Sequence, residues 1–241
     1  MEFSGKSVLV TGAGKGIGRA TARLLAARGA EVVAISRSKD DLDSLAAEIG
    51  CRCIAADLAD PHAARRAALE ALPVDALVNN AGTTALASFL DVTEADFDFV
   101  MGVNARAAMI VGQEYARDRV KRGLPGAIVN VSSVASSVGI ADHTAYCASK
   151  GALDAITRVM AIELGRHAIR VNAVNPTVTL TPMAVKAWSD PKKSEPMLAR
   201  IPLGHFATPE DVAEAILFLL SDRAAMMNGV MLPVDGGFGV T

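Results

Sequence analysis

The sequence is poor in residues that mark several classes of protein. It has three cysteines, Cys51, Cys53 and Cys147, which form neither a disulfide framework nor the two cysteine pairs of a zinc site. Aromatic residues make up 4% of the chain, and none of the four histidines has the spacing of a metal ligand, so no metal is expected. We expect three reduced thiols, with Cys51 and Cys53 packed on one face of a strand.

An excess of one charge and a long apolar run are also lacking. Lys and Arg number 24 against 26 Asp and Glu, a net charge of −2 that gives no reason to expect nucleic acid or an anionic membrane as partner. No stretch approaches the roughly 20 apolar residues of a membrane span. The start, MEFSGKSVLV, has no secretory pattern. We expect a cytoplasmic globular protein, whose 51% of hydrophobic residues build a large core.

Short β-branched runs alternate with longer segments rich in alanine and leucine. The pattern predicts strands at Ser7–Thr11, Glu31–Ser36, Arg52–Ala55, Ala76–Asn79, Ala127–Ser132, Arg170–Asn175 and Val230–Val234. It predicts helices at Ile17–Ala27, Asp41–Ile49, Pro61–Leu72, Ala95–Arg122, Ala145–Gly165 and Pro209–Leu220. Apolar strands separated by helices indicate a parallel sheet covered on both faces. No linker divides the chain, so we expect residues 1–241 to form a single doubly wound α/β domain, a Rossmann fold of about seven strands.

A glycine-rich loop, TGAGKGIG at residues 11–18, follows the first predicted strand. A phosphate-binding P-loop is excluded, because Lys15 is followed by Gly16 instead of Ser or Thr, and the spacing Gly-x-Gly-x-x-Gly also fails. The loop fits Gly-x-x-x-Gly-x-Gly, in which a helix N-terminus offers its free N–H groups to a pyrophosphate. The alternative is a merely glycine-rich turn. The candidate cofactor-binding residues here are Gly12, Gly14, Lys15, Gly16, Ile17 and Gly18.

The end of the second predicted strand bears on the choice between NAD and NADP. A site for NAD places an Asp or Glu there, to bond the ribose 2′-hydroxyl. This sequence has Ser36 and Arg37 instead. Arg37 together with Lys15 can clamp a 2′-phosphate, because a guanidinium forks onto phosphate oxygens. Two solvated surface cations are the alternative. The residues favour NADP(H).

Two titratable side chains share one face at the start of a long predicted helix. Tyr146 and Lys150 are four residues apart, and a nearby ammonium lowers the pKa of a phenol. Ser133 lies at the C-terminal end of a predicted strand, and the run Asn79–Gly82 ends another. Ligands bind at that edge of open α/β sheets, so we expect a proton-transfer site there.

Taken together, these motifs resemble the short-chain dehydrogenase/reductase family over essentially the full length of the chain. The matching motifs are TGAGKGIG, Asp57-Leu58, the NNAG run at 79–82, Asn104, Ser133, Tyr146 and Lys150. The resemblance implies that Tyr146 is the general acid in carbonyl reduction and the general base in the reverse reaction. It implies that Ser133 stabilises charge on the substrate oxygen, and that Asn104 supports a proton relay to Lys150.

The same resemblance extends the expected cofactor site beyond the glycine loop, Ser36 and Arg37. Lys150 is expected to lower the pKa of Tyr146 and to hold the nicotinamide ribose. One departure is the run Asn175-Pro176-Thr177, where the family usually has Pro-Gly. The further cofactor-binding residues implied are Asp57, Leu58, Asn80, Ala81, Gly82, Tyr146, Lys150, Pro176, Val178 and Thr179.

One subgroup of the family shares still longer runs, and it carries the same departure from Pro-Gly. These runs are GAIVNVSS, KGALD, IRVNAVNPTV, WSDP, RIPLG and AILFLLSDR. The subgroup is tetrameric and reduces α-dicarbonyls and L-xylulose with NADPH. The resemblance implies the same chemistry on a small carbonyl substrate, in a homotetramer. It also implies a substrate pocket formed by Ser133, Ala135, His143 and Trp188, with a loop at about 177–201 that covers the substrate. The sequence itself indicates that Thr177–Ile201, with its three prolines, is irregular and a candidate for a mobile loop.

Several readings of these residues stay open. Trp188 can simply pack the loop, and His143 can simply bond its neighbours. The small and apolar run 134–138 favours a substrate less polar than a polyol if it lines the pocket. A polyol or secondary-alcohol dehydrogenase working in the oxidative direction is the alternative enzyme. A non-catalytic dinucleotide sensor is the alternative outside enzymes, although it has no need of Tyr146 and Lys150.

Overall fold

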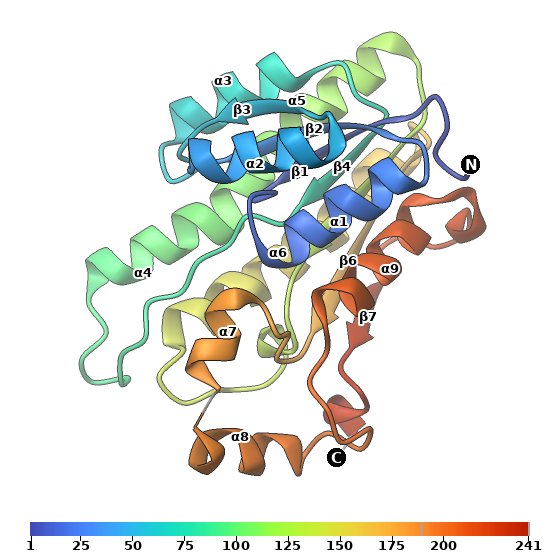
Figure 1. Cartoon of the computed structure of the whole chain (residues 1–241). Helices are drawn as coiled ribbons and strands as arrows, with labels where there is room; N and C mark the ends of the chain where they lie inside the picture. The colour runs from blue at the N-terminus through green and yellow to red at the C-terminus, as the bar shows by residue number, and fades with distance from the viewer. Residues whose placement is uncertain (189, 241) are drawn as a thin grey trace.

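The computed structural model in Figure 1 describes residues 1–188 and 190–240. Its strands are all parallel and form one seven-stranded sheet in the order β3-β2-β1-β4-β5-β6-β7. They are β1 (Ser7–Thr11), β2 (Glu31–Ser36), β3 (Arg52–Ala55), β4 (Ala76–Asn79), β5 (Gly126–Val131), β6 (Ile169–Pro176) and β7 (Met231–Val234). Every predicted strand is confirmed to within one residue at each end.

Helices cover both faces of the sheet (Figure 1). Helices α1, α2 and α9 pack on one face, and α3, α5 and α6 pack on the other. The helices are α1 (Gly16–Ala27), α2 (Lys39–Ile49), α3 (Pro61–Ala71), α4 (Glu94–Met101), α5 (Ala107–Arg122), α6 (Thr144–Gly165), α7 (Pro182–Ala187), α8 (Pro191–Leu198) and α9 (Pro209–Leu220). Within the described ranges, no helix combines the length and the apolar character needed to cross a membrane.

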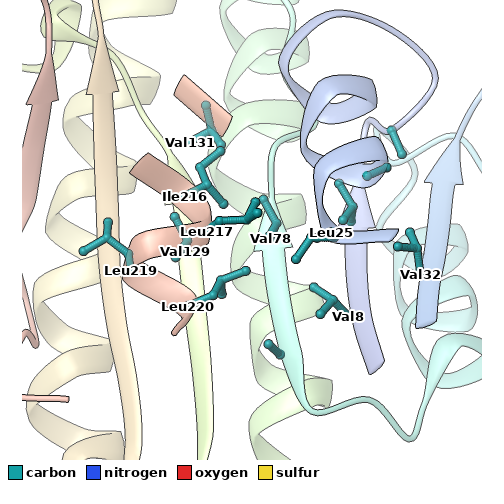
Figure 2. Close-up of a cluster of buried hydrophobic side chains, with 14 of the residues drawn as sticks. Val8, Leu25, Val32, Val78, Val129, Val131, Ile216, Leu217, Leu219 and Leu220 are labelled. Atoms are coloured by element: carbon teal, nitrogen blue, oxygen red, sulfur yellow. The ribbon is translucent and has the colours of Figure 1, made fainter. Parts of the chain in front are cut away.

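Two apolar layers fix the sheet between these helices. Successive residues of a strand point to opposite faces, so Val8 packs toward α1 and α9 while Leu9 packs toward α3 and α5. Figure 2 shows the first layer, in which Ile216 and Leu217 of α9 meet Val129 of β5. These side chains are fully buried, and each stabilises the fold by about 1.5–3 kcal/mol through removal of its apolar surface from water. The rigid sheet carries all its strand C-termini to one edge.

Two segments differ from their predictions. The single helix predicted at Ala95–Arg122 is interrupted by a π-helical turn at Gly102–Arg106, which separates α4 from α5. The segment Thr177–Ile201, expected to be irregular, contains α7 and α8. Each of these short helices begins with a capping residue followed by proline, and both helices are too short to show an apolar periodicity. Ser189, within the WSDP run, lies outside the described residues.

Candidate active site

The glycine loop joins β1 to α1, and the N-terminus of α1 has no side-chain cap. Lys15 occupies the N-cap position in an extended conformation, and the first turn holds no acidic residue. By contrast, Ser38 caps α2 and Thr208 caps α9 through side-chain oxygens. The first N–H groups of α1 are therefore left to an external acceptor, and the positive end of the helix dipole favours an anion.

Close packing explains the glycines of this loop. A Cβ on Gly18 would lie well under 3.0 Å from Gly12 O and Asn80 Nδ2, a separation that real Cβ atoms essentially never show. Gly16 has a φ of +55°, and a Cβ there would meet Thr181 Cγ2 at 2.8 Å. The loop thus touches the end of β4 on one side and the start of α7 on the other.

Hydrogen bonds fix the loop against the segment after β4. Thr11 Oγ1 accepts from the backbone N–H groups of Asn80 and Ala81, at 3.0 and 3.1 Å. Asn80 Nδ2 donates back to Thr11 O at 3.0 Å and to Gly12 O at 3.1 Å. The structure therefore brings together the glycine loop and the NNAG run, as the sequence predicts.

The two predicted cations flank the loop in different states. Lys15 Nζ lies 3.1 Å from Asp41 Oδ2, so its charge is partly compensated. Arg37 is exposed at the end of β2, and in the described part of the chain no carboxylate lies within ion-pair distance of it. Ser36 Oγ packs against Gly14. Arg37 is thus the more available cation for an incoming anion.

Asp57 and Leu58, two of the predicted cofactor-binding residues, follow the end of β3. Asp57 is exposed, and its Oδ1 accepts from Ala59 N at 3.0 Å, which makes a tight turn. Leu58, beside it, is buried in the apolar layer toward α3. The exposed carboxylate therefore sits at the same sheet edge as the glycine loop, on a turn fixed by its buried neighbour.

Ser133, Tyr146 and Lys150 converge at the C-terminal edge of β5. The Ser133 side chain is close enough to the Tyr146 phenol to lower its pKa. Lys150 Nζ lies 5.6 Å from the centre of the Tyr146 ring and donates to Val131 O at 2.8 Å. Ser133 Oγ also accepts from Ala135 N at 3.1 Å, which fixes the hydroxyl at the start of the turn Val134–Ser136. A phenol, a hydroxyl and an ammonium thus meet in one place.

Burial dominates the protonation behaviour of this group. Burial raises the pKa of Tyr146, and the hydrogen bond from Ser133 offsets it only in part. This direction is opposite to the lowering expected from Lys150, because removing a phenolate from water is costly. Burial also lowers the pKa of Lys150 to about 8, while the charge of Asp154 raises it. With its pKa raised, Tyr146 keeps its proton at neutral pH.

Asn104 is held rigidly on the π-helical turn. Its Oδ1 accepts from Thr83 N at 2.7 Å, and its Nδ2 donates to Thr83 O and Ser149 Oγ, both at 2.9 Å. Ser149 in turn donates to Tyr146 O at 2.7 Å. A Cβ built on Gly82 would lie 3.5 Å from Asn104 Oδ1 and 3.6 Å from Lys150 Nζ, so both groups face the same small space.

Of the other three predicted pocket residues, Ala135 and His143 contact this group, and Trp188 lies in a neighbouring apolar cluster. Ala135 is buried beside Ser133, and the His143 ring meets the Tyr146 ring edge-on with centres 6.1 Å apart. His143 Nδ1 lies 2.6 Å from Ala141 O and must donate to it, so Nε2 of the neutral ring is an acceptor. Trp188 packs against Phe206, with ring centres 5.6 Å apart, in a cluster that includes Val134 next to Ser133.

The exit of β6 closes the site. Ser133 Oγ donates weakly to Pro176 O at 3.4 Å, Val178 is half-buried, and Thr179 pairs with Ala207. The sequence reasoning missed four residues that contact the site: Thr181, Ser149, Asn175 and Asp154. The signal for Thr181 was present, since a threonine before proline marks a helix N-cap. A signal for Asp154 was also present, because it lies four residues after Lys150 on the same helix. Ser149 and Asn175 act through tertiary contacts that no sequence pattern marks.

These residues suit a dinucleotide. An uncapped helix N-terminus and a free arginine fit phosphate groups, and hydrogen-bonding groups at the strand ends fit ribose hydroxyls. Among the described residues, no cluster of three or more His, Cys, Asp or Glu side chains could hold a metal ion.

Comparisons with known proteins agree with this arrangement. Residues 12–239 match the family model described as enoyl-(acyl carrier protein) reductase. The chain is 54% identical to L-xylulose reductase of Bos taurus, over 100% of this chain and 99% of that protein. It is 48% identical to carbonyl reductase (NADPH) 2 of Sus scrofa, over 99% and 98% of the two chains.

A solved structure described as an NAD(P)-dependent gluconate 5-dehydrogenase of Beutenbergia cavernae, with NADP bound at low occupancy, has the same fold. It superposes with a TM-score of 0.95 at 37% identity and covers 100% of both chains. The comparisons therefore indicate a nicotinamide dinucleotide as the class of cofactor. Together with its full-length relatives, the site establishes that the chain is an oxidoreductase and belongs to the short-chain dehydrogenase/reductase family.

Proposed function

We propose that the protein reduces the carbonyl group of a small α-dicarbonyl or ketose, such as L-xylulose, with NADPH. The observation that carries the proposal is the meeting of Ser133, Tyr146 and Lys150 beside a dinucleotide loop. The names of the full-length relatives, L-xylulose reductase and carbonyl reductase, support the substrate class. The bound dinucleotide supplies the hydride that reduces the carbonyl carbon.

The protein's own residues handle the proton and the charge. The Ser133 hydroxyl donates to the substrate oxygen and stabilises its developing negative charge. Tyr146 donates its proton to the same oxygen, as a general acid. The Lys150 ammonium, 5.6 Å from the Tyr146 ring, stabilises the phenolate left behind. Asn104, clamped by Thr83 and Ser149, holds one end of a proton path toward Lys150.

The protonation of the site favours the reductive direction. Reduction consumes a proton from Tyr146, whereas oxidation of an alcohol needs the phenolate as a base. Because burial raises the pKa of Tyr146, the proton donor is the dominant form at neutral pH.

Cofactor preference rests on Arg37. NADP carries a negatively charged 2′-phosphate, and this group lies where an NAD site has a carboxylate that bonds the ribose. At this position the chain has Arg37, which is exposed and has no ion pair in the described ranges. Lys15, already shared with Asp41, plays the smaller part. The NADP bound in the related structure supports this choice.

The remaining features of the proposal concern the whole chain. Residues 1–241 act as one catalytic unit, and the segment 177–201 covers the substrate through Trp188. We place the protein in the cytoplasm, consistent with its free thiols, and as a homotetramer. Exposed apolar side chains on α6, Val159 and Ile162, support burial of that face in an oligomer.

Initial rates test the proposed function directly. The wild-type protein is assayed with NADPH and with NADH against diacetyl, L-xylulose, other ketoses and xylitol. We expect the highest kcat/KM with NADPH and a dicarbonyl or ketose. A higher kcat/KM for oxidation of xylitol would replace the proposal with the polyol dehydrogenase, and a higher kcat/KM with NADH would refute the preference for NADPH. Light scattering during size exclusion gives the oligomeric state.

A further inference from the structure

Two buried charges of opposite sign lie one turn apart on α6. Lys150 is 3% exposed and Asp154 is 6% exposed. Over residues 1–188 and 190–240, neither has an ion-pair partner within 4.0 Å. The other carboxylate buried in that part of the chain, Glu114, contacts both Arg65 and Arg117. In the described residues, the charge of Lys150 is therefore compensated by Asp154 alone, and the charge of Asp154 by Lys150 alone.

Asp154 also reaches the segment that carries Ser133. Its Oδ2 accepts from Asn175 Nδ2 at 3.0 Å, and its Oδ1 has no hydrogen-bond partner. The same Asn175 amide group lies 3.1 Å from Ser133 O and 3.0 Å from Ser136 Oγ. One carboxylate thus holds the amide that ties the end of β6 to the turn after β5.

The surroundings of Lys150 leave Asp154 as its charge partner. Tyr146 is the titratable group one turn earlier on α6, and Asp154 is the charged group one turn later. β5 presents the carbonyl of Val131, and the π-helical turn presents the uncharged amide of Asn104. Burial lowers the pKa of Lys150, and the carboxylate of Asp154 opposes that change.

We propose that Asp154 is a positioning residue for the proposed reduction. Its buried carboxylate keeps Lys150 protonated at neutral pH and, through Asn175, holds the Ser133 segment in place. The inference rests on the proposed function for its effect on catalysis. The charge coupling between Asp154 and Lys150 is independent of that function.

The first experiment measures kcat/KM for carbonyl reduction as a function of pH. Asp154→Asn keeps an oxygen that can accept from Asn175 and removes the charge. We expect the alkaline limb of the profile to move down by about one pH unit, because Lys150 loses its proton more readily. Asp154→Glu should restore the wild-type limb. The matched control, Glu114→Gln, should lower Tm and leave the limb in place. An Asp154→Asn limb that coincides with wild type would overturn the proposal.

The second experiment needs no activity and separates the two claims. Tm is measured for wild type, Asp154→Asn, Lys150→Met and the double variant. Asp154→Asn should lower Tm in the wild-type background and raise it beside Lys150→Met, where Asp154 alone is uncompensated. Equal changes in both backgrounds would overturn the coupling. If Asp154→Asn alone does not fold, recovery of folding in the double variant supports the proposal and its failure refutes it. A wild-type protein without reductase activity would refute only the proposed function.

Discussion

The close contact between α1 and the end of β4 predicts that Gly18→Ala destabilises the protein. Gly18→Ala places a Cβ against Gly12 O and Asn80 Nδ2, and one of these is backbone that cannot rotate away. Overpacking of this kind costs about 1–3 kcal/mol. In a domain of this size, each kcal/mol corresponds to about 2–4 °C in Tm, so Tm should fall by about 2–12 °C.

Gly151→Ala is the matched control in another helix. Gly151 lies within α6, and a Cβ there would meet only Ser136 O, at an ordinary distance of 3.6 Å. Removal of a helical glycine gains about 0.5–1 kcal/mol, so Tm should rise by about 1–4 °C. Differential scanning fluorimetry without cofactor measures both variants. If Gly18→Ala is as stable as wild type, the close packing of the loop is not what requires glycine at this position.

Three further predictions concern charge, pH and a helix cap. Arg37→Asp should lower the ratio of kcat/KM for NADPH to that for NADH by about 10- to 100-fold, since a charge-assisted hydrogen bond contributes about 1.5–3 kcal/mol. The control Arg66→Asp, an exposed arginine on α3, should leave this ratio unchanged. In the wild type, the rate of reduction should decline as pH rises through about 8, because the lowered pKa of Lys150 marks the loss of its proton; a flat profile to pH 10 would contradict this. Thr208→Ala removes the side-chain oxygen that accepts from Asp211 N in the capping box of α9 and should lower Tm by about 2–4 °C in thermal unfolding.

The sequence predicted the sheet well because its strands are short, β-branched and bounded by clear helix signals. Gly50, in a left-handed conformation, ends α2, and Pro209 begins α9 directly after its N-cap residue. Both helix ends lie where the sequence pattern predicts them. The π-helical turn at Gly102–Arg106 has no such signal, because its extra residue shows in the backbone path alone. Helices α7 and α8 have capping signals in the sequence, but helices this short form only when they pack against the rest of the protein.

The candidate site was predictable where a motif places residues on one element or one sheet edge. Tyr146 and Lys150 share a helical face, and Ser133 ends the neighbouring strand, so their meeting follows from spacing. The direction of the Tyr146 pKa did not follow, because burial depends on the whole fold. The bond from Asn175 to Asp154 spans 21 residues and likewise has no local pattern. The assigned catalytic and cofactor-binding roles stay predictions.

The most direct test of the central claim is the turnover of Tyr146→Phe with NADPH and the best carbonyl substrate. The variant keeps the ring and loses only the hydroxyl that Ser133 contacts. We expect kcat to fall by about 10²–10⁴-fold, the usual contribution of a general acid, while the Kd for NADPH from fluorescence stays close to wild type. Turnover near the wild-type rate, with NADPH still bound, would contradict the role of Tyr146 as proton donor.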